Sequence, residues 1–310
     1  MKKTVNTPRL TGNRRPNENS IKRNILDCIK SVDVLFFAFF LLTTLLIILA
    51  REQSPKDFLN LLSVRATILF WIAIIVYLNG IRKHPALNFI RNTYPILLSG
   101  YFYSETVHYN KLFFRNIDPW LENVEVLFFG MQPSIEFSLH FSNRLFSELM
   151  YFGYFSFYVL ILGFTLFVSF REKRFFHKAV FLLSSSLYIF YFLFGLIPSA
   201  GPQFYFSSPD NILPNAYFFD KIMHFIQRTA EQPTGAFPSS HVGISLIILM
   251  MSRKKAPIFF KVALPLTVLL VLSTVYIKAH YVIDVLGAII VAPFILYLSR
   301  FLYSLFSKRT

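Results

Sequence analysis

Long apolar runs recur along the chain after residue 31 and constrain its fold more than any other feature. A helix needs about 20 mostly apolar residues to cross the hydrocarbon core of a bilayer. Eight runs approach this length, at 32–50, 60–80, 86–104, 147–170, 177–198, 238–252, 257–277 and 281–304. Only 15% of the residues are charged and 55% are hydrophobic. The sequence therefore predicts an all-α, polytopic membrane helical bundle of about eight spans.

Basic residues are concentrated on one side of this expected topology. If the spans alternate in direction, most of the 31 lysines and arginines fall in the tail 1–31, in the turn near Arg82 and Arg91, in the connections near 171–178 and 253–261, and at the C-terminal end. Such residues mark cytoplasmic loops. Both termini are thus expected in the cytoplasm, and the loops 105–146 and 199–237 on the extracytoplasmic face, which is periplasmic or lumenal.

The net charge of +15 does not indicate nucleic acid as a partner, because the basic residues are scattered over separate loops. Anionic membrane lipids are the expected counterparts. The chain has a single cysteine, which excludes an internal disulfide and a cysteine-based metal site. No cofactor motif is found, and no cofactor is expected.

Two short stretches place ionisable residues at the ends of apolar runs. In "GAFPSSHVG", Ser239 or Ser240 can cap a helix whose first turn holds His241. A helix start attracts anions such as phosphate, although the serines can also serve only as caps. In "KAHYVIDVLG", His280 and Asp284 are four residues apart and share a face if helical, and Ser273 lies on that face if the helix is continuous. Ionisable residues at membrane depth are rare and are usually functional.

Both stretches belong to the same membrane face, so they can converge. Two imidazoles with one carboxylate suit phosphoryl transfer through a histidine. Neutral His280 would attack phosphorus, Asp284 would hold its tautomer, and His241 would exchange protons with the leaving and entering oxygens. The same three residues could instead ligate zinc or iron, a less favoured alternative without a further ligand cluster.

The segments "FPSSHVG" and "STVYIKAHYVIDVLGA" resemble the second and third motifs of the type 2 phosphatidic acid phosphatase superfamily. The spelling "HYVID", with "LIPSAGPQFYF" and "IDPWLENVEVLFFGMQPS", is similar to its inositol phosphorylceramide synthase branch. The resemblance implies a six-helix catalytic core, no metal, His280 as nucleophile, Asp284 as its partner and His241 as acid and base. It also implies that Ser239 and Ser240 surround the phosphate, with Ser273 at the start of the third motif.

The family's cationic phosphate clamp has no match in this chain. Its first motif is missing, and Thr274 replaces the arginine of the third motif. Lys278 is a candidate replacement only if the helix is broken there, because two residues along a helix turn it about 200° from His280. Arg228 and Lys221 are further candidates. After Gly201-Pro202 the branch often has arginine, where this chain has Gln203.

These features predict a membrane lipid phosphotransferase that moves an inositol phosphate-like head group from a phospholipid donor to a lipid hydroxyl. The close alternative is a lipid phosphate or polyprenyl diphosphate phosphatase with the same residues. A non-catalytic transporter or scaffold is the third possibility. The expected parts are a disordered basic cytoplasmic tail at 1–31, N-terminal membrane helices at 32–85 and a catalytic membrane core at 86–305.

Overall fold

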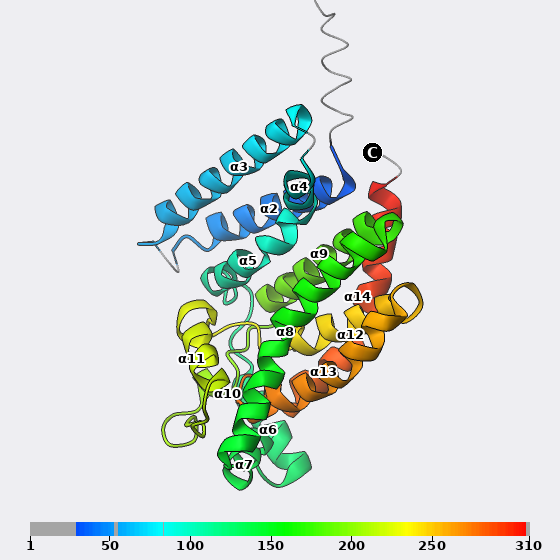
Figure 1. Ribbon diagram of the computed structural model, residues 1–310. Helices are drawn as coiled ribbons and strands as arrows, with labels where there is room; N and C mark the ends of the chain where they lie inside the picture. The colour runs from blue at the N-terminus through cyan, green and yellow to red at the C-terminus, as the bar shows by residue number, and fades with distance from the viewer. Residues whose placement is uncertain (1–28, 53–54, 83, 308–310) are drawn as a thin grey trace, which may run out of the picture.

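The computed structural model describes residues 29–52, 55–82 and 84–307, and this part of the chain is all-helical, as predicted (Figure 1). Most of the expected disordered tail, residues 1–28, lies outside the described residues. The helices are α2 (Ser31–Leu49), α3 (Phe58–Ile81), α4 (Pro85–Leu97), α5 (Ser99–Glu105), the short 3-10 helix η1 (Thr106–His108), α6 (Asp118–Phe129), α7 (Pro133–His140), α8 (Arg144–Arg171), α9 (Lys173–Leu196), α10 (Pro202–Tyr205), α11 (Phe219–Ala230), α12 (Ser240–Lys255), α13 (Pro257–Tyr276) and α14 (Val282–Phe306).

Six of these helices in the described chain are long and apolar enough to cross a membrane: α2, α3, α8, α9, α13 and α14. The other two expected spans also form helices, but they differ in length. The run at 86–104 is divided at Leu98 into α4 and α5, and Pro95 lies within the final turn of α4. The run at 238–252 forms α12, which has 16 residues and ends in Arg253, Lys254 and Lys255.

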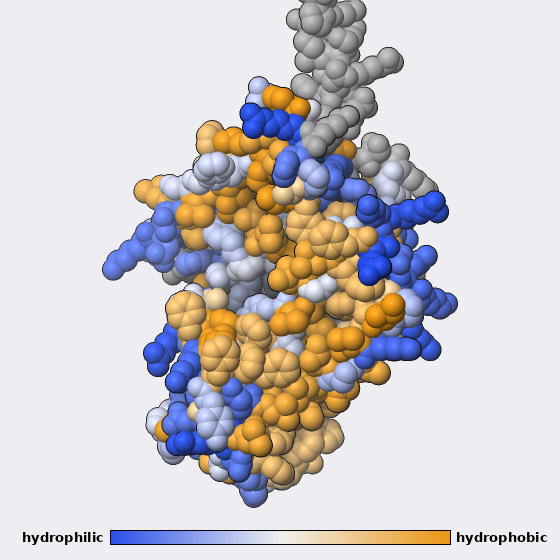
Figure 2. Space-filling model, viewed as in Figure 1, coloured by the Kyte–Doolittle hydropathy of each residue, from blue (hydrophilic) through white to orange (hydrophobic). Residues whose placement is uncertain are grey.

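Helix α9 is the central helix of the bundle. In its most apolar window 78% of the residues are buried, against 11% in α3 at the outside. It packs against α2, α4, α5, α8, α12 and α14. Figure 2 shows apolar side chains over the flank of the molecule that α8 and α13 help to build, and exposed Leu162 and Val268 belong to these two helices. This arrangement suits a bundle surrounded by lipid.

Two buried ion pairs fasten the N-terminal helices to the rest of the bundle. Arg65 of α3 donates from Nε and Nη2 to the two carboxylate oxygens of Glu105 in α5, at 3.1 Å each. Arg91 of α4 pairs with Asp33 at the start of α2. Charges at membrane depth require partners, because an unpaired charge is costly there. The two pairs thus fix α2 and α3 against α4 and α5.

The loops at one end of the bundle are held together by hydrogen bonds from backbone amides, some of them to the carboxylate of Asp118. Asp118, at the start of α6, accepts from the amides of Ala200 and Gly201. Gly201 has a φ of 87°, and a Cβ there would stand 2.7 Å from the carbonyl oxygen of Ala279, so only glycine fits. The amide of Ala236 donates to Ser199. Three loops that are distant in sequence therefore meet around residue 280.

Candidate active site

The start of α12 forms one side of the site. Ser239 is the N-cap, and its Oγ accepts from the amide of Val242 at 3.3 Å. The amide of Ser239 donates to the carbonyl oxygen of Asp284, which joins α12 to α14. Ser240 and His241 follow in the first turn. The structure thus contains the predicted serine cap and the predicted histidine in the first turn of the helix.

The loop between α13 and α14 forms the other side. Helix α13 ends at Tyr276, and Lys278 adopts a φ of 61°, so the helix is broken before His280. His280 and Asp284 nevertheless meet, with His280 Nδ1 at 3.4 Å from Asp284 Oδ2. The same carboxylate oxygen accepts from the amide of Tyr281 at 2.8 Å, which caps α14. Asp284 therefore contacts the imidazole and organises the turn that carries it.

The two histidines face each other directly. His241 Nδ1 lies 3.2 Å from His280 Nε2, and His280 Nδ1 lies 2.8 Å from the carbonyl oxygen of Ala236. A carbonyl oxygen can only accept, so Nδ1 of His280 must carry the proton of the neutral ring. The lone pair of His280 is then on Nε2 and points toward His241. Ala236 thus helps to set the tautomer, a role that the sequence prediction gave to Asp284 alone.

Burial lowers the pKa of His280 to about 4, although the Ala236 carbonyl and Glu231 oppose the shift. The side chain is 4% exposed. At neutral pH the imidazole is therefore uncharged, as a nitrogen nucleophile must be.

Three predicted substrate-binding residues do not meet the histidines. Ser273 is buried against α8, where its Oγ donates to the carbonyl oxygen of Leu269. Lys278 turns away and donates from Nζ to the carbonyl oxygens of Asp210 and Ile212, at 2.6 Å each. Arg228 is exposed near the end of α11. The helix is broken before Lys278, which was the condition for Lys278 to assist His280. Its ammonium group is bound instead by the carbonyl oxygens of the loop 210–212.

A half-buried carboxylate that was not predicted from the sequence lies beside the histidines. Glu231 shares a narrow hollow with both rings. Its two oxygens accept from Tyr154 Oη at 2.9 Å and from Gln203 Nε2 at 2.6 Å. Burial raises the pKa of Glu231. Its sequence signal was available, because Glu231 is the only acidic residue between Asp220 and Asp284.

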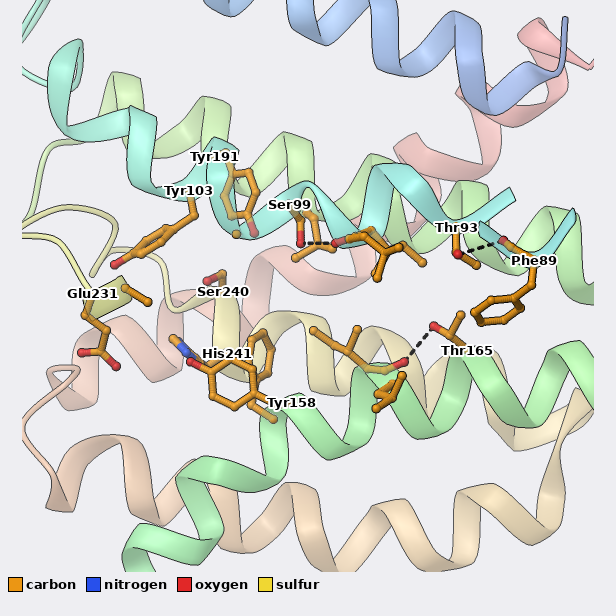
Figure 3. A pocket seen from close by; sticks show the side chains of 18 residues that line it. Phe89, Thr93, Ser99, Tyr103, Tyr158, Thr165, Tyr191, Glu231, Ser240 and His241 are labelled. Atoms are coloured by element: carbon orange, nitrogen blue, oxygen red, sulfur yellow. Dashed lines mark hydrogen bonds between the residues drawn. The ribbon is translucent and has the colours of Figure 1, made fainter. Parts of the chain in front are cut away.

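A larger cavity of about 400 Å³ opens onto the same place. It runs between α4 and α5 on one side and α8 on the other, as Figure 3 shows, with Ser240, His241 and Glu231 at one end. Tyr103 lines both this cavity and the narrow hollow. None of the described residues that line either space is a lysine or an arginine.

Within the described residues, no three of the histidine, cysteine, aspartate and glutamate side chains are arranged to hold a metal ion.

The family comparison matches the segment that builds this geometry. The model of the PAP2 superfamily, the type 2 phosphatidic acid phosphatases, matches residues 123–298, which is more than half of the chain. A PA-phosphatase related-family protein of Dictyostelium discoideum is 30% identical over 116 residues, 36% of this chain and 21% of that protein. This chain therefore matches only about a fifth of that relative's length. No solved structure matches the chain significantly.

Proposed function

Because this chain belongs to the PAP2 superfamily of phosphatases and phosphotransferases, it is an enzyme of phosphoryl transfer, and we propose that it moves a phosphoryl-linked head group from a phospholipid to a lipid hydroxyl. The observation that carries the proposal is the orientation of His280, whose Nδ1 is held by the Ala236 carbonyl while Nε2 faces His241. A neutral imidazole fixed in this way is a nucleophile with an acid and base beside it.

In the proposed first step, the lone pair of His280 Nε2 forms a bond to phosphorus, and the bond from phosphorus to the leaving lipid oxygen breaks. Protonated His241 gives its proton to that oxygen. In the second step His241 takes the proton of the entering hydroxyl, whose oxygen bonds to phosphorus as the nitrogen–phosphorus bond breaks. Asp284, at 3.4 Å from His280 Nδ1, stabilises the positive charge that the ring acquires while it is phosphorylated.

The negative charge of the transferring group needs stabilisation. None of the described side chains that line the two spaces is a lysine or an arginine, so the stabilisation must come from another group. The first turn of α12 supports this role, since the first N–H groups of a helix lack partners within the helix and lie at the positive end of its dipole. His241 and Ser240 belong to that turn.

A lipid hydroxyl as the acceptor is supported by the surroundings of His280. The side chain is almost fully buried, and the cavity that leads to its partner His241 is lined mainly by apolar side chains. Exclusion of water protects a covalent intermediate from hydrolysis. The inositol phosphate head group belongs to this proposal on the basis of the "HYVID" and "FPSSH" spellings. The proposed partners are thus a phospholipid donor, a lipid hydroxyl acceptor and the surrounding membrane lipids.

Hydrolysis of a lipid phosphate is the second candidate function. The similarity to the Dictyostelium relative, a PA-phosphatase related-family protein, favours it. The covalent intermediate would be the same, with water in place of the lipid hydroxyl. The two functions therefore differ only in the second step.

The proposed orientation places the histidines at the extracytoplasmic face and both termini in the cytoplasm. A hollow between α9, α12 and α14 at the other end of the bundle is lined by basic residues, among them Lys178, Arg253 and Arg300. This separation agrees with the rule that basic residues stay on the cytoplasmic side.

The test uses the purified full chain in detergent with phosphatidylinositol and ceramide, and in parallel with phosphatidic acid alone. Lipids are read by mass spectrometry and free phosphate by a colour assay, with His280→Ala as the control. A new inositol phospholipid that disappears in His280→Ala supports the transferase. Free phosphate that depends on His280, without a new lipid, replaces the transferase with the phosphatase. Absence of both products from folded protein rejects both functions with these substrates.

A further inference from the structure

The 400 Å³ cavity has a polar end and an apolar end. Its polar end contains His241, Ser240, Glu231 and the hydroxyl of Tyr103, and its other end lies between Phe89 and Thr165 (Figure 3). The residues in between are mainly apolar. They include Ile96, Leu97, Phe157, Ile161, Leu162 and Leu187.

The serine and threonine hydroxyl groups along the apolar part donate to carbonyl oxygens of their own helices. Thr93 donates to the carbonyl oxygen of Phe89 at 2.9 Å, Ser99 to that of Ile96 at 2.6 Å, and Thr165 to that of Ile161 at 2.8 Å. Figure 3 draws these bonds along the helices rather than across the cavity. A hydroxyl that bonds its own backbone leaves no unpaired donor facing the space. Beyond Ser240, the polar groups that remain in the lining are the hydroxyls of Tyr158 and Tyr191.

The length of the cavity matches a hydrocarbon chain. Phe89 and Tyr103 mark its two ends on α4 and α5, and the 14 helical steps between them extend at most roughly 20 Å at 1.5 Å each, since the helix is divided at Leu98. One leaflet contributes about half of the 30 Å hydrocarbon thickness of a bilayer. The cavity is therefore long enough for a chain of ordinary membrane lipids, and Figure 2 shows this face of the molecule hollowed beside α5 and α8.

We infer that this cavity binds one hydrocarbon chain of the lipid substrate, with its phosphate placed at His241 and its tail between α4 and α8. The inference rests on the proposed function, because the chemistry at His280 defines which end receives the phosphate. The N-terminal helices then help to shape the cavity, because the pair of Arg65 in α3 and Glu105 in α5 holds α5, which forms part of the cavity wall.

Two glycines give a matched test. Gly100 lines the cavity, and a Cβ on it meets no atom within 4 Å, so Gly100→Phe projects a ring into the channel without a backbone clash. Gly80 lies on helix α3 outside the cavity, and a Cβ there also meets no atom within 4 Å. Gly80→Phe therefore makes the same helical substitution with no effect on the channel. Leu162→Trp, at an exposed lining position of α8, narrows the channel from the opposite wall.

Binding is measured first, independently of turnover, with a phospholipid that carries a photoactivatable group on one acyl chain. The full chain with His280→Ala is cross-linked in lipid nanodiscs and digested. We expect labelled peptides from 89–103 and 157–165, with labelling reduced about tenfold by Gly100→Phe and unchanged by Gly80→Phe. Labels confined to other helices, or equal labelling of these peptides with and without Gly100→Phe, overturn the inference.

Turnover is then compared for donors with long and with six-carbon chains. We expect Gly100→Phe to lower the ratio of long-chain to short-chain kcat/KM about tenfold, and Gly80→Phe to leave that ratio at the wild-type value. A tenfold change corresponds to about 1.4 kcal/mol, less than the burial of two methylene groups. An unchanged ratio in Gly100→Phe contradicts the channel, and Leu162→Trp provides the same comparison if Gly100→Phe fails to fold. Labelling of the channel without turnover of any donor would reject the proposed function and leave the binding site standing.

Discussion

The Nδ1 nitrogen of His241 lies 3.2 Å from the Nε2 nitrogen of His280. The Ala236 carbonyl accepts the proton of His280 Nδ1, so His280 Nε2 has a lone pair and His241 Nδ1 is the proton-bearing nitrogen of the contact. The two rings therefore cannot exchange roles without rearrangement. In the proposed mechanism His280 is therefore the group that bonds to phosphorus, and His241 is the group that moves protons.

This division of roles predicts different defects in the two histidine variants. His280→Ala should form no covalent intermediate with any donor. His241→Ala should lose about 10²- to 10⁴-fold in kcat with a phospholipid donor, the usual contribution of an acid–base group. With a nitrophenyl ester donor, whose leaving group needs no proton, His241→Ala should still become phosphorylated. Mass spectrometry of the peptide 277–284 measures the phosphorylation of His280. A label on His241 in the His280→Ala variant, with no label in the His241→Ala variant, would reverse the assignment.

The low pKa of His280 predicts the acid limb of the pH profile. Since kcat/KM reports the free enzyme, the contribution of His280 should stay complete down to about pH 5 and fall as the pH passes about 4. Glu231 raises the pKa of His280 only while its carboxyl is charged, and burial raises the pKa of Glu231 itself. Glu231 is therefore protonated near pH 4, and Glu231→Gln should leave this limb nearly unchanged. A limb that moves clearly to lower pH in Glu231→Gln would show that Glu231 stays charged beside His280.

The same shift predicts how stability responds to acid. The folded pKa of about 4 lies below the ordinary value of 6.5, so the unfolded chain binds more protons between these two pH values. The contribution of His280 to stability is complete above pH 6.5 and is lost as the pH falls toward 4. Thermal unfolding in detergent from pH 4 to 7 measures this, and His280→Ala should reduce the dependence on pH.

The sequence predicted the membrane bundle and brought the two histidines together, because both depend on local signals. Apolar runs locate helices, and the cap at Ser239 with the spacing of His280 and Asp284 locates the motifs. The positions of Glu231 and Gln203 could not be predicted from such signals. They depend on how the loops 199–203, 231–236 and 277–281 pack, through long-range contacts such as the one between Gly201 and Ala279.

The fate of Lys278 shows the same limit. From the sequence, Lys278 could assist His280 only if the helix is broken there, and it is broken. The direction of the Lys278 side chain, however, is set by the carbonyl oxygens of Asp210 and Ile212, more than 60 residues away in the sequence. Helical periodicity contains no information on such a contact. Ser273 was expected near the site on the assumption of a continuous helix. Its Oγ packs instead against Gly153 of α8, so closely that a Cβ on residue 153 would clash with it.

The positions of Ala236 and Asp284 predict a moderate effect for Asp284→Asn. The amide oxygen can still accept from the Tyr281 amide, so the cap of α14 is retained. The variant loses the charge that stabilises the phosphorylated ring, while Ala236 still holds the tautomer at 2.8 Å. We expect kcat to fall about 10²-fold, less than the roughly 10⁴-fold loss found where a carboxylate alone sets the tautomer. Unchanged kcat would assign Asp284 to the cap only, and thermal unfolding checks that the fold is intact.

The buried pair of Arg65 and Glu105 predicts strong coupling between α3 and α5. Both side chains are 2% exposed, and the bond is bidentate. Removing one partner leaves a charge buried without compensation, which costs about 3 to 5 kcal/mol. Arg65→Leu and Glu105→Leu should each lower the thermal stability strongly, and the double variant should be less destabilised than the two single effects predict together. Thermal unfolding of the four proteins in one detergent gives the coupling.

Arg51→Leu is the matched control for this cycle. Arg51 is exposed in the turn after α2, where a substitution changes stability by only about 0.5 kcal/mol or less. A loss in Arg65→Leu no larger than that in Arg51→Leu would mean that the ion pair does not hold the two helices together. Additive losses in the double variant would mean that each side chain stabilises the bundle through other contacts, such as Arg65 with Thr43 and Phe40. Strong coupling would instead identify the pair as the link between the N-terminal helices and the wall of the cavity.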